Sequence, residues 1–390
     1  MFDADLASVL TTVGLAALGA YLAILLLKAV LSWRYASRHP ETMIKEAPIT
    51  VVQPILSGDA FLETALERNL TNAPSYATFL WLLDADDAEA WRIAEALRAR
   101  WPGRIQLVAC SPPAGNVNPK TCKLQQAMPH LETPYVAVLD DDTILEDAIP
   151  GKAMAVLDAC DLYTGLPCYL PGVNVWSSLV THFVNNNSIV TYLPLLNFLQ
   201  PISINGMFYV MRTEKLRELG GFTAILDQLC DDYAMARLVK SKGGILRQGV
   251  TPLRLRTTVD GAGQYVRLLH RWFVFANVLA NDQPVGTLML LFLFLGLPPF
   301  LLWLSFLTLF GGWWALALPA GLLTRYAILR GLHRFVFGAG VRFSFFVSVA
   351  SELLQPLHWM HASVQRRLMW RRRAILLGRD GRFAYVGDQP

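Results

Sequence analysis

Three consecutive aspartates, Asp140, Asp141 and Asp142, are the clearest candidates for chemistry in this sequence. Alternate carboxylates such as Asp140 and Asp142 can share one hard divalent cation, either Mg²⁺ or Mn²⁺. A cation held by one or two carboxylates often takes its remaining ligands from substrate phosphates. The pattern therefore indicates a metal site that binds a phosphorylated substrate. The alternative is a solvated acidic turn, because two aspartates at this spacing are common.

A second acidic cluster, Asp84, Asp86 and Asp87, also follows an apolar run. A carboxylate at the end of a strand can hydrogen-bond the base or ribose of a nucleotide, which makes Asp84 and Asp86 candidate nucleotide ligands. The alternative is an acidic start to the helix expected over residues 87–100, which the helix dipole favours. We assign Asp87 to that structural role.

Lysines and a third acidic pair complete the candidate site. In the stretch 115–128, either Lys120 or Lys123 can neutralise a diphosphate, or both can be exposed on a helix that follows a loop. Asp231 and Asp232 precede a stretch that is expected to be helical. A carboxylate at a helix N-terminus is stabilised as the anion and suits a general base. The alternative is that these aspartates only cap the helix.

The stretch 264–279 mixes basic and aromatic residues. Arg267, His270 and Arg271 have the spacing of one helical face, and Trp272 follows directly. Such a helix can lie on a bilayer and present Arg271 to a leaving diphosphate. Plain interfacial anchoring is the alternative.

The elements that must position these residues alternate between strands and helices. Apolar runs at 48–56, 77–87, 104–110 and 135–145 are separated by helical stretches, and two of the runs end abruptly in acids. This alternation predicts an α/β, Rossmann-like domain with a mostly parallel sheet. Ligands of such sheets bind at the carboxyl ends of the strands, so both acidic clusters are expected to face one crevice.

Both ends of the chain look like membrane segments. The chain is 54% hydrophobic and only 16% charged, whereas soluble domains carry about 25% charged residues. Residues 6–27 form an uncharged run that is long enough to cross a bilayer. Basic residues follow this run, so we expect an uncleaved anchor with residue 34 onward in the cytoplasm.

Three further apolar stretches lie in the C-terminal part. We expect two full spans, with a turn at Gly311 and Gly312, and a re-entrant or interfacial segment over 343–364. The expected organisation is a transmembrane anchor (1–34), a cytoplasmic catalytic domain (48–260), an interfacial amphipathic helix (261–283), C-terminal membrane segments (284–364) and a basic cytoplasmic tail (365–390).

The composition argues against nucleic-acid binding and against sites built from cysteines. A net charge of +4 is small for a nucleic-acid-binding protein, so no nucleic-acid partner is expected. The five cysteines include no Cys-x-x-Cys pair, which argues against a disulfide framework and a zinc site.

Taken in order, the motifs resemble a known family. An N-terminal anchor, Asp84, Asn-Pro-Lys at 118–120, Asp140–Asp142, Gly-Leu-Pro at 165–167, Asp-Asp-Tyr at 231–233, Arg271-Trp272 and a basic tail follow one another. This order is similar to that of the ceramide glucosyltransferase family, in a bacterial-type form. That family falls within the larger family-2 inverting glycosyltransferases with a GT-A fold.

The resemblance implies a role for each matching residue. Asp232 resembles the catalytic base. Asp84, Asp140, Arg271 and Trp272 resemble nucleotide-sugar ligands of the family, and Asp140 and Asp142 would hold Mn²⁺ or Mg²⁺. The residue pattern adds Asp86, Lys120 and Asp231 to the expected nucleotide-sugar ligands. One position departs from the family pattern, because Leu268 stands where the (Gln/Arg)-x-x-Arg-Trp motif begins.

The implied function is transfer of a hexose from a UDP-sugar to a lipid hydroxyl, forming a β-glycolipid at the cytoplasmic face of a bacterial inner membrane. The partners would be the UDP-sugar, a ceramide-like acceptor and the bilayer, in which the chain would be a multi-pass protein. The alternatives are another lipid acceptor such as a hopanoid or diacylglycerol, a processive polysaccharide synthase, and a non-catalytic lipid-binding scaffold.

Overall fold

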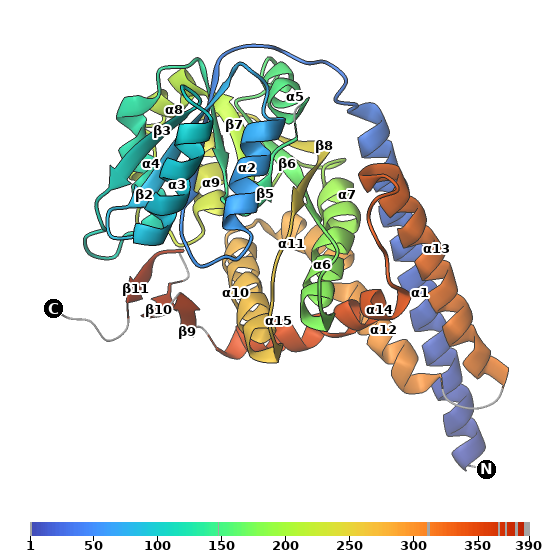
Figure 1. The fold of residues 1–390 in the computed structure, drawn as a ribbon. Coiled ribbons are helices and arrows are strands. Elements are labelled where there is room, and N and C mark those ends of the chain that lie inside the picture. The colour runs from blue at the N-terminus through green and yellow to red at the C-terminus, as the bar shows by residue number, and fades with distance from the viewer. Residues whose placement is uncertain are drawn as a thin grey trace. The chain divides into compact units, whose positions relative to one another are not determined.

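The computed structural model describes residues 2–146, 148–309, 313–365, 367–370, 373–378 and 381–385. Over these residues the chain divides into two compact units. The helical unit comprises Met1–Arg38, Tyr169–Phe198 and Thr257–Arg366. The sheet unit comprises His39–Cys168, Leu199–Arg256 and Arg367–Pro390. Figure 1 shows the elements of both units.

The sheet unit is built on a mixed sheet. Within the described residues this sheet has eight strands in the order β3-β2-β1-β4-β7-β6-β8-β5. Strands β1, β2, β3 and β4 are parallel to one another, and β7 joins β4 in the antiparallel direction. The strands are β1 (Ile49–Ile55), β2 (Ala77–Asp84), β3 (Ile105–Cys110), β4 (Tyr135–Leu139), β5 (Thr143–Ile144), β6 (Leu162–Tyr169), β7 (Phe208–Arg212) and β8 (Leu246–Leu255).

The parallel strands are the apolar runs of the sequence. All five residues of β4 are buried, and β1 and β2 are buried over most of their lengths. Strands buried on both faces require helices on both faces of the sheet. The helices of the unit are α2 (Leu62–Asn72), α3 (Ala88–Arg100), α4 (Pro119–Ala127), α5 (Ala148–Val156), α8 (Thr213–Glu218) and α9 (Asp231–Ser241). The predicted α/β architecture is confirmed.

The helix predicted after the second acidic cluster begins as its sequence indicates. The Asp87 carboxylate accepts hydrogen bonds from the backbone N–H groups of Ala90, at 3.1 Å, and Ser57, at 2.9 Å. Asp87 is therefore the N-cap of α3, as predicted.

The C-terminal tail contains a small antiparallel sheet. Its described strands are β9 (Arg367–Trp370), β10 (Arg373–Leu377) and β11 (Phe383–Tyr385). The Gly381 carbonyl accepts a hydrogen bond of 3.1 Å from the Leu229 N–H, and Arg382 lies 2.8 Å from the Asp227 carboxylate. The tail thus contacts the loop that leads into α9. Of the arginines in this tail, Arg366, Arg371, Arg372 and Arg379 lie outside the described residues.

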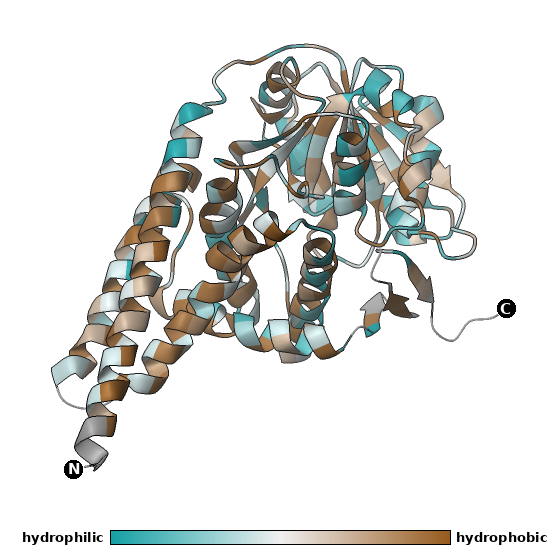
Figure 2. Cartoon of the chain, turned by 180° about the vertical axis from the view of Figure 1, so that it is seen from behind, coloured by the Kyte–Doolittle hydropathy of each residue, from teal (hydrophilic) through white to brown (hydrophobic). Residues whose placement is uncertain are grey.

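Among the described residues, two helices are long and apolar enough to cross a membrane, judged by length and composition only. They span Leu6–Arg38 and Val285–Thr308. Only 28% and 22% of their most apolar windows are buried inside the protein, so neither is a core helix of the ordinary soluble type. In Figure 2 the helix that begins at the N label is apolar over much of its length.

The helical unit contains α-helices, two π-helices and a 3₁₀ helix among its described residues. They are α1 (Phe2–Arg38), α6 (Val175–Asn187), the π-helix η2 (Ser188–Tyr192), α7 (Leu193–Leu195), α10 (Ala262–Asn281), α11 (Val285–Leu291), the π-helix η4 (Phe292–Gly296), α12 (Leu297–Thr308), the 3₁₀ helix η5 (Trp313–Leu316), α13 (Ala317–Phe337), α14 (Phe345–Leu353) and α15 (Gln355–Val364).

The C-terminal membrane segments differ in detail from simple spans. The second expected span corresponds to α13, which carries Arg325 and Arg330 and is not one of the two candidate spans. The stretch 343–364 forms two short helices, α14 and α15, of nine and ten residues. The turn predicted at Gly311 and Gly312 lies outside the described residues. The number of spans and the side of the tail stay predictions.

Close packing joins three helices of this unit. A Cβ atom at Gly14 of α1 would lie 2.4 Å from the Thr308 hydroxyl of α12. A Cβ atom at Gly321 of α13 would lie 2.8 Å from the Leu18 side chain of α1. Small residues permit such close approach between helices in a membrane, where van der Waals packing drives association.

Candidate active site

The aspartates lie where parallel strands end. Strand β1 lies between β2 and β4, and all three run in the same direction. Asp84 is the last residue of β2, and Asp140 follows directly after β4. The two acidic clusters therefore flank the carboxyl end of β1. This arrangement is the one that the alternation of strands and helices predicts.

Lys123 of α4 joins the Asp84 side of this edge to β1. Its ammonium group lies 3.0 Å from the Asp84 carboxylate and donates a hydrogen bond of 2.8 Å to the Ile55 carbonyl. The Lys123 side chain is only 4% exposed, whereas that of Asp84 is 22% exposed. Lys123 is thus a buried support, and part of the Asp84 carboxylate stays open to a ligand.

Lys120, one helical turn earlier, lies between two aspartates. Its ammonium group is 2.7 Å from Asp140 and 3.2 Å from Asp231, and it donates to the Gly206 carbonyl at 3.2 Å. Although burial lowers the pKa of Lys120, Asp140 and Asp231 together raise it well above its ordinary value. Lys120 is therefore a permanent cation at the site. Of the two lysines that the sequence offered, Lys120 is the one placed between carboxylates.

Asp141 and Asp142 have different surroundings. Asp141 accepts a hydrogen bond of 2.9 Å from the Leu56 N–H at the end of β1. Asp142 lies 3.3 Å from the Thr143 hydroxyl. Burial, followed by the charges of Asp140 and Asp141, raises the pKa of Asp142 well above its ordinary value. The raised pKa means that full ionisation of the triplet is unfavourable without a further compensating cation.

This donor set fits a hard divalent cation. Asp140 and Asp142 supply carboxylate oxygens, which are the ligands that Mg²⁺ and Mn²⁺ prefer. Across the described part of the chain, no group of three or more His, Cys, Asp or Glu side chains is arranged to hold a metal ion. A cation on Asp140 and Asp142 would accordingly need oxygens from water or a substrate to complete its shell.

Asp231 and Asp232 form the first turn of α9, and neither is its N-cap. The cap position is Cys230, which makes no side-chain capping hydrogen bond, and Asp231 pairs with Lys120 instead. Burial and the adjacent Asp231 charge raise the pKa of Asp232 to about 7. A Cβ atom at Gly206 would lie 3.3 Å from Asp232 Cβ, so the absence of a side chain there leaves room beside this carboxylate.

Asn118 connects the helix of the lysines to the loop before Asp231, and we did not predict this role. Its Oδ1 accepts from the Lys120 N–H at 3.0 Å, which caps α4. Its Nδ2 donates to the carbonyls of Gln228 and Leu229, both at 3.1 Å. Asn118 is fully buried. An asparagine followed by proline at the start of a helix is the sequence signal for such a cap.

The remaining predicted ligands are Asp86, Arg271 and Trp272. Asp86 is exposed in the turn after β2, and the described residues give it no ion pair or side-chain hydrogen bond. Arg271 and Trp272 belong to α10 of the helical unit. There Trp272 stacks on Phe183 of α6, with ring centroids 6.1 Å apart. The binding roles of these three residues stay predictions.

Two solved structures of glycosyltransferases are similar to this chain. The mannosyltransferase PcManGT from Pyrobaculum calidifontis, solved in complex with GDP-Man and Mn²⁺, is 16% identical. The match covers 91% of this chain and 98% of that chain, with a TM-score of 0.50. GalNAc-T7, solved with UDP, GalNAc and Mn²⁺, is 12% identical over 64% of this chain and 54% of that chain, with a TM-score of 0.41. No curated protein sequence matches this chain.

The mannosyltransferase likeness agrees with a GT-A fold, and the predicted fold class is thereby confirmed. A family model described as glycosyl transferase family 21 matches residues 9–383, which is nearly the whole chain. With the aspartate cluster at the carboxyl ends of its parallel strands, the chain belongs to glycosyl transferase family 21.

Proposed function

We propose that this glycosyltransferase is membrane-bound and transfers a hexose from a UDP-sugar to a lipid hydroxyl, with inversion. The observation that carries the proposal is the meeting of Lys120, Asp140 and Asp231 beside Asp232. A cation between carboxylates can receive a diphosphate, and a carboxylate with a raised pKa can receive a proton. The acceptor that we favour is a ceramide-like sphingolipid, and the product would then be a β-glycolipid.

In the proposed reaction, Asp232 takes the proton of the acceptor hydroxyl as its oxygen attacks the anomeric carbon. The bond from that carbon to the UDP oxygen breaks in the same step, so an α-linked donor gives a β-linked product. Lys120 and Arg271 would bind the departing diphosphate. Asp84 and Asp86 would bind the nucleoside, with Trp272 as a further donor contact.

Asp140 and Asp142 would hold Mn²⁺ or Mg²⁺, which would neutralise diphosphate charge when bound. PcManGT supports both a nucleotide-sugar donor and a divalent ion, because it was solved with GDP-Man and Mn²⁺. The two candidate spans and the exposed apolar surface of α1 support a lipid acceptor. A cytoplasmic catalytic domain and a bacterial inner membrane complete the proposal.

The test is a transfer assay with the full chain in nanodiscs. UDP-glucose, UDP-galactose and UDP-N-acetylglucosamine are each paired with ceramide, diacylglycerol or a hopanoid, in Mn²⁺, Mg²⁺ or EDTA. We expect metal-dependent glycolipid formation that Asp232→Asn lowers by about 10²-fold to 10⁴-fold, the usual contribution of a general base. Asp158→Asn is the matched control, because Asp158 is 62% exposed and pairs with Lys45 and Arg212.

Other results would identify other functions. A polymeric product would indicate a processive synthase. Metal-dependent transfer to diacylglycerol or a hopanoid would change the acceptor and keep the site. Absence of both transfer and UDP binding would reject the enzyme assignment and favour a lipid-binding scaffold. Near-wild-type turnover of Asp232→Asn would show that another group is the base.

A further inference from the structure

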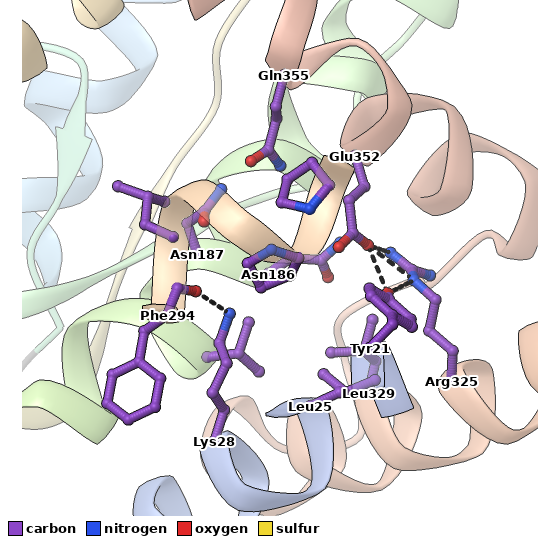
Figure 3. Close-up of a pocket in the computed structure, with 14 residues that line it drawn as sticks. Tyr21, Leu25, Lys28, Asn186, Asn187, Phe294, Arg325, Leu329, Glu352 and Gln355 are labelled. Atoms are coloured by element: carbon purple, nitrogen blue, oxygen red, sulfur yellow. Dashed lines mark hydrogen bonds and ion pairs between the residues drawn. The ribbon is translucent and has the colours of Figure 1, made fainter. Parts of the chain in front are cut away.

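A small polar cavity lies inside the helical unit, among apolar helices. Its volume is about 30 Å³, which is room for roughly two water-sized groups. Lys28, Arg325, Glu352 and Gln355 line it, and Figure 3 shows their side chains around the same space. The residues that line this cavity have no role in the proposed transfer reaction.

One of the two cations at the cavity is already neutralised. The Arg325 guanidinium lies 2.7 Å from the Glu352 carboxylate, and the Tyr21 hydroxyl donates to the same carboxylate at 2.9 Å. Arg325 is 1% exposed and Glu352 is 15% exposed. This pair therefore has no net charge, and Glu352 has no remaining charge with which to neutralise a second cation.

Lys28 is the second cation. It is 6% exposed, and among the described residues it forms no ion pair. Its ammonium group donates one hydrogen bond, to the Phe294 carbonyl in the π-helix η4. That carbonyl lacks its usual helical donor, because the residues four and five positions later are Pro298 and Pro299. One ammonium proton satisfies the carbonyl, and the other two are left for the cavity.

Gln355 adds uncharged polar groups. It is 9% exposed, it lines the cavity, and the described residues give it no hydrogen bond. Lys28 and Gln355 thus present unused donors to a space whose lining carries a net charge of +1, from Lys28, Arg325 and Glu352.

The position of Lys28 along α1 indicates where its ligand comes from. The 22 uncharged residues 6–27 precede it, and at about 1.5 Å per residue they are about 33 Å long. The hydrocarbon core of a bilayer is about 30 Å thick. If this run crosses the bilayer, Lys28 is the first charged residue after it, and a lysine so placed can reach the head groups and their phosphates.

We propose that this cavity binds the oxyanion of a phosphate diester, supplied by a membrane phospholipid, with Lys28 as the counter-charge and Gln355 as a hydrogen-bond donor. The space admits one or two phosphate oxygens and excludes a sugar or an acyl chain. Such a lipid would hold α1 against η4 and α15. Phospholipid binding at this cavity does not depend on which sugar or acceptor the enzyme uses.

The test measures thermal unfolding of the detergent-purified full chain with phosphatidylglycerol, diacylglycerol or inorganic phosphate, together with native mass spectrometry. We expect phosphatidylglycerol to raise the midpoint by several degrees and to remain bound, and diacylglycerol to do neither. Lys28→Met should lose both effects. Arg34→Gln is the matched control, because it removes one charge from an exposed position of the same helix.

Other outcomes would distinguish a phospholipid site from a site for free phosphate or for water. If Lys28→Met does not fold, Gln355→Glu replaces it, because it keeps the bond from Lys28 to Phe294 and should still lose phosphatidylglycerol. Stabilisation by inorganic phosphate alone would overturn the lipid source. Equal stabilisation of wild type and Lys28→Met, or no shift with any probe, would show that the cavity holds water only.

Discussion

At the scale of single residues, two lysines of α4 form ion pairs with different aspartates of the site. Lys123 is committed to Asp84 and to β1, whereas Lys120 lies between Asp140 and Asp231. Lys123 is therefore the lysine that supports the fold, and Lys120 is the one that we propose binds the diphosphate. The spacing of the two residues on α4 does not distinguish them.

The raised pKa of Asp232 predicts a pH dependence. A general base must be deprotonated, so kcat/KM should fall about tenfold per pH unit below about 7 and level off above it. The sign follows from burial and from the Asp231 charge, which both favour the protonated acid. A pH profile of transfer would measure this limb. The residual activity of Asp232→Asn should lack it, and an identical limb in that variant would assign the titration to another group.

Asn118→Asp tests the connection between α4 and the loop before α9. The new carboxylate can still cap α4, but it cannot donate to the carbonyls of Gln228 and Leu229 and would face both at close range. Loss of such bonds costs about 1–3 kcal/mol, so we expect UDP affinity to fall about 10-fold to 100-fold.

The matched control for this variant is Asn174→Asp. Asn174 caps α6, and its Nδ2 donates to the Val259 carbonyl at 2.8 Å, so the same chemistry is changed in the helical unit. UDP titration and thermal unfolding are measured for both variants. If both lose stability and UDP affinity equally, Asn118 has no positioning role.

At the scale of elements, the close contacts of α1 predict a difference between two glycines. Gly14→Leu should lower the unfolding midpoint in detergent, because its Cβ would lie 2.4 Å from Thr308 and such overpacking typically costs about 1–3 kcal/mol. Gly19→Leu should leave the midpoint unchanged, because nothing lies within 4 Å of its Cβ. Equal midpoints for the two variants would contradict this packing of α1 on α12.

The strands were predictable because their apolar runs are buried and end in aspartates. Parallel strands end at one edge, so the sequence was sufficient to bring Asp84 and Asp140 to the same edge. The partners of each aspartate were not predictable, since Lys123, Ile55 and Asp84 come from three separate elements. The exposure of Asp86 depends on the turn geometry after β2, which a cluster of acids does not specify.

The C-terminal elements show a different limit of sequence reasoning. Residues 343–364 have the composition of one polar span, yet α14 and α15 separate at Leu354. Part of the polarity of this stretch is explained by Glu352 of α14, which forms an ion pair with Arg325 of α13. The tail was predicted only as basic. Its three described strands pair with their neighbours in the chain, and a basic composition does not indicate such strands.

At the scale of the whole molecule, the basic residues after residue 27 predict a cytoplasmic sheet unit. Glu89→Cys, at an exposed position of α3, gives a reporter in a background of Cys122→Ala, since the other four cysteines are buried. A membrane-impermeant maleimide should leave this cysteine unmodified in intact cells and label it after permeabilisation. Labelling of intact cells would reverse the predicted orientation.

The order of the central strands limits where the chain can accept inserted residues. Neighbouring strands are about 4.8 Å apart, so β1 sets a separation of about 9.6 Å between the ends of β2 and β4. If Asp84 binds the nucleoside and Asp140 the diphosphate, the width of β1 fixes the distance between the two binding positions of the donor. An extra strand beside β1 would move one end out of the donor's reach. Inserted residues should therefore be accepted in surface loops and rejected between these three strands.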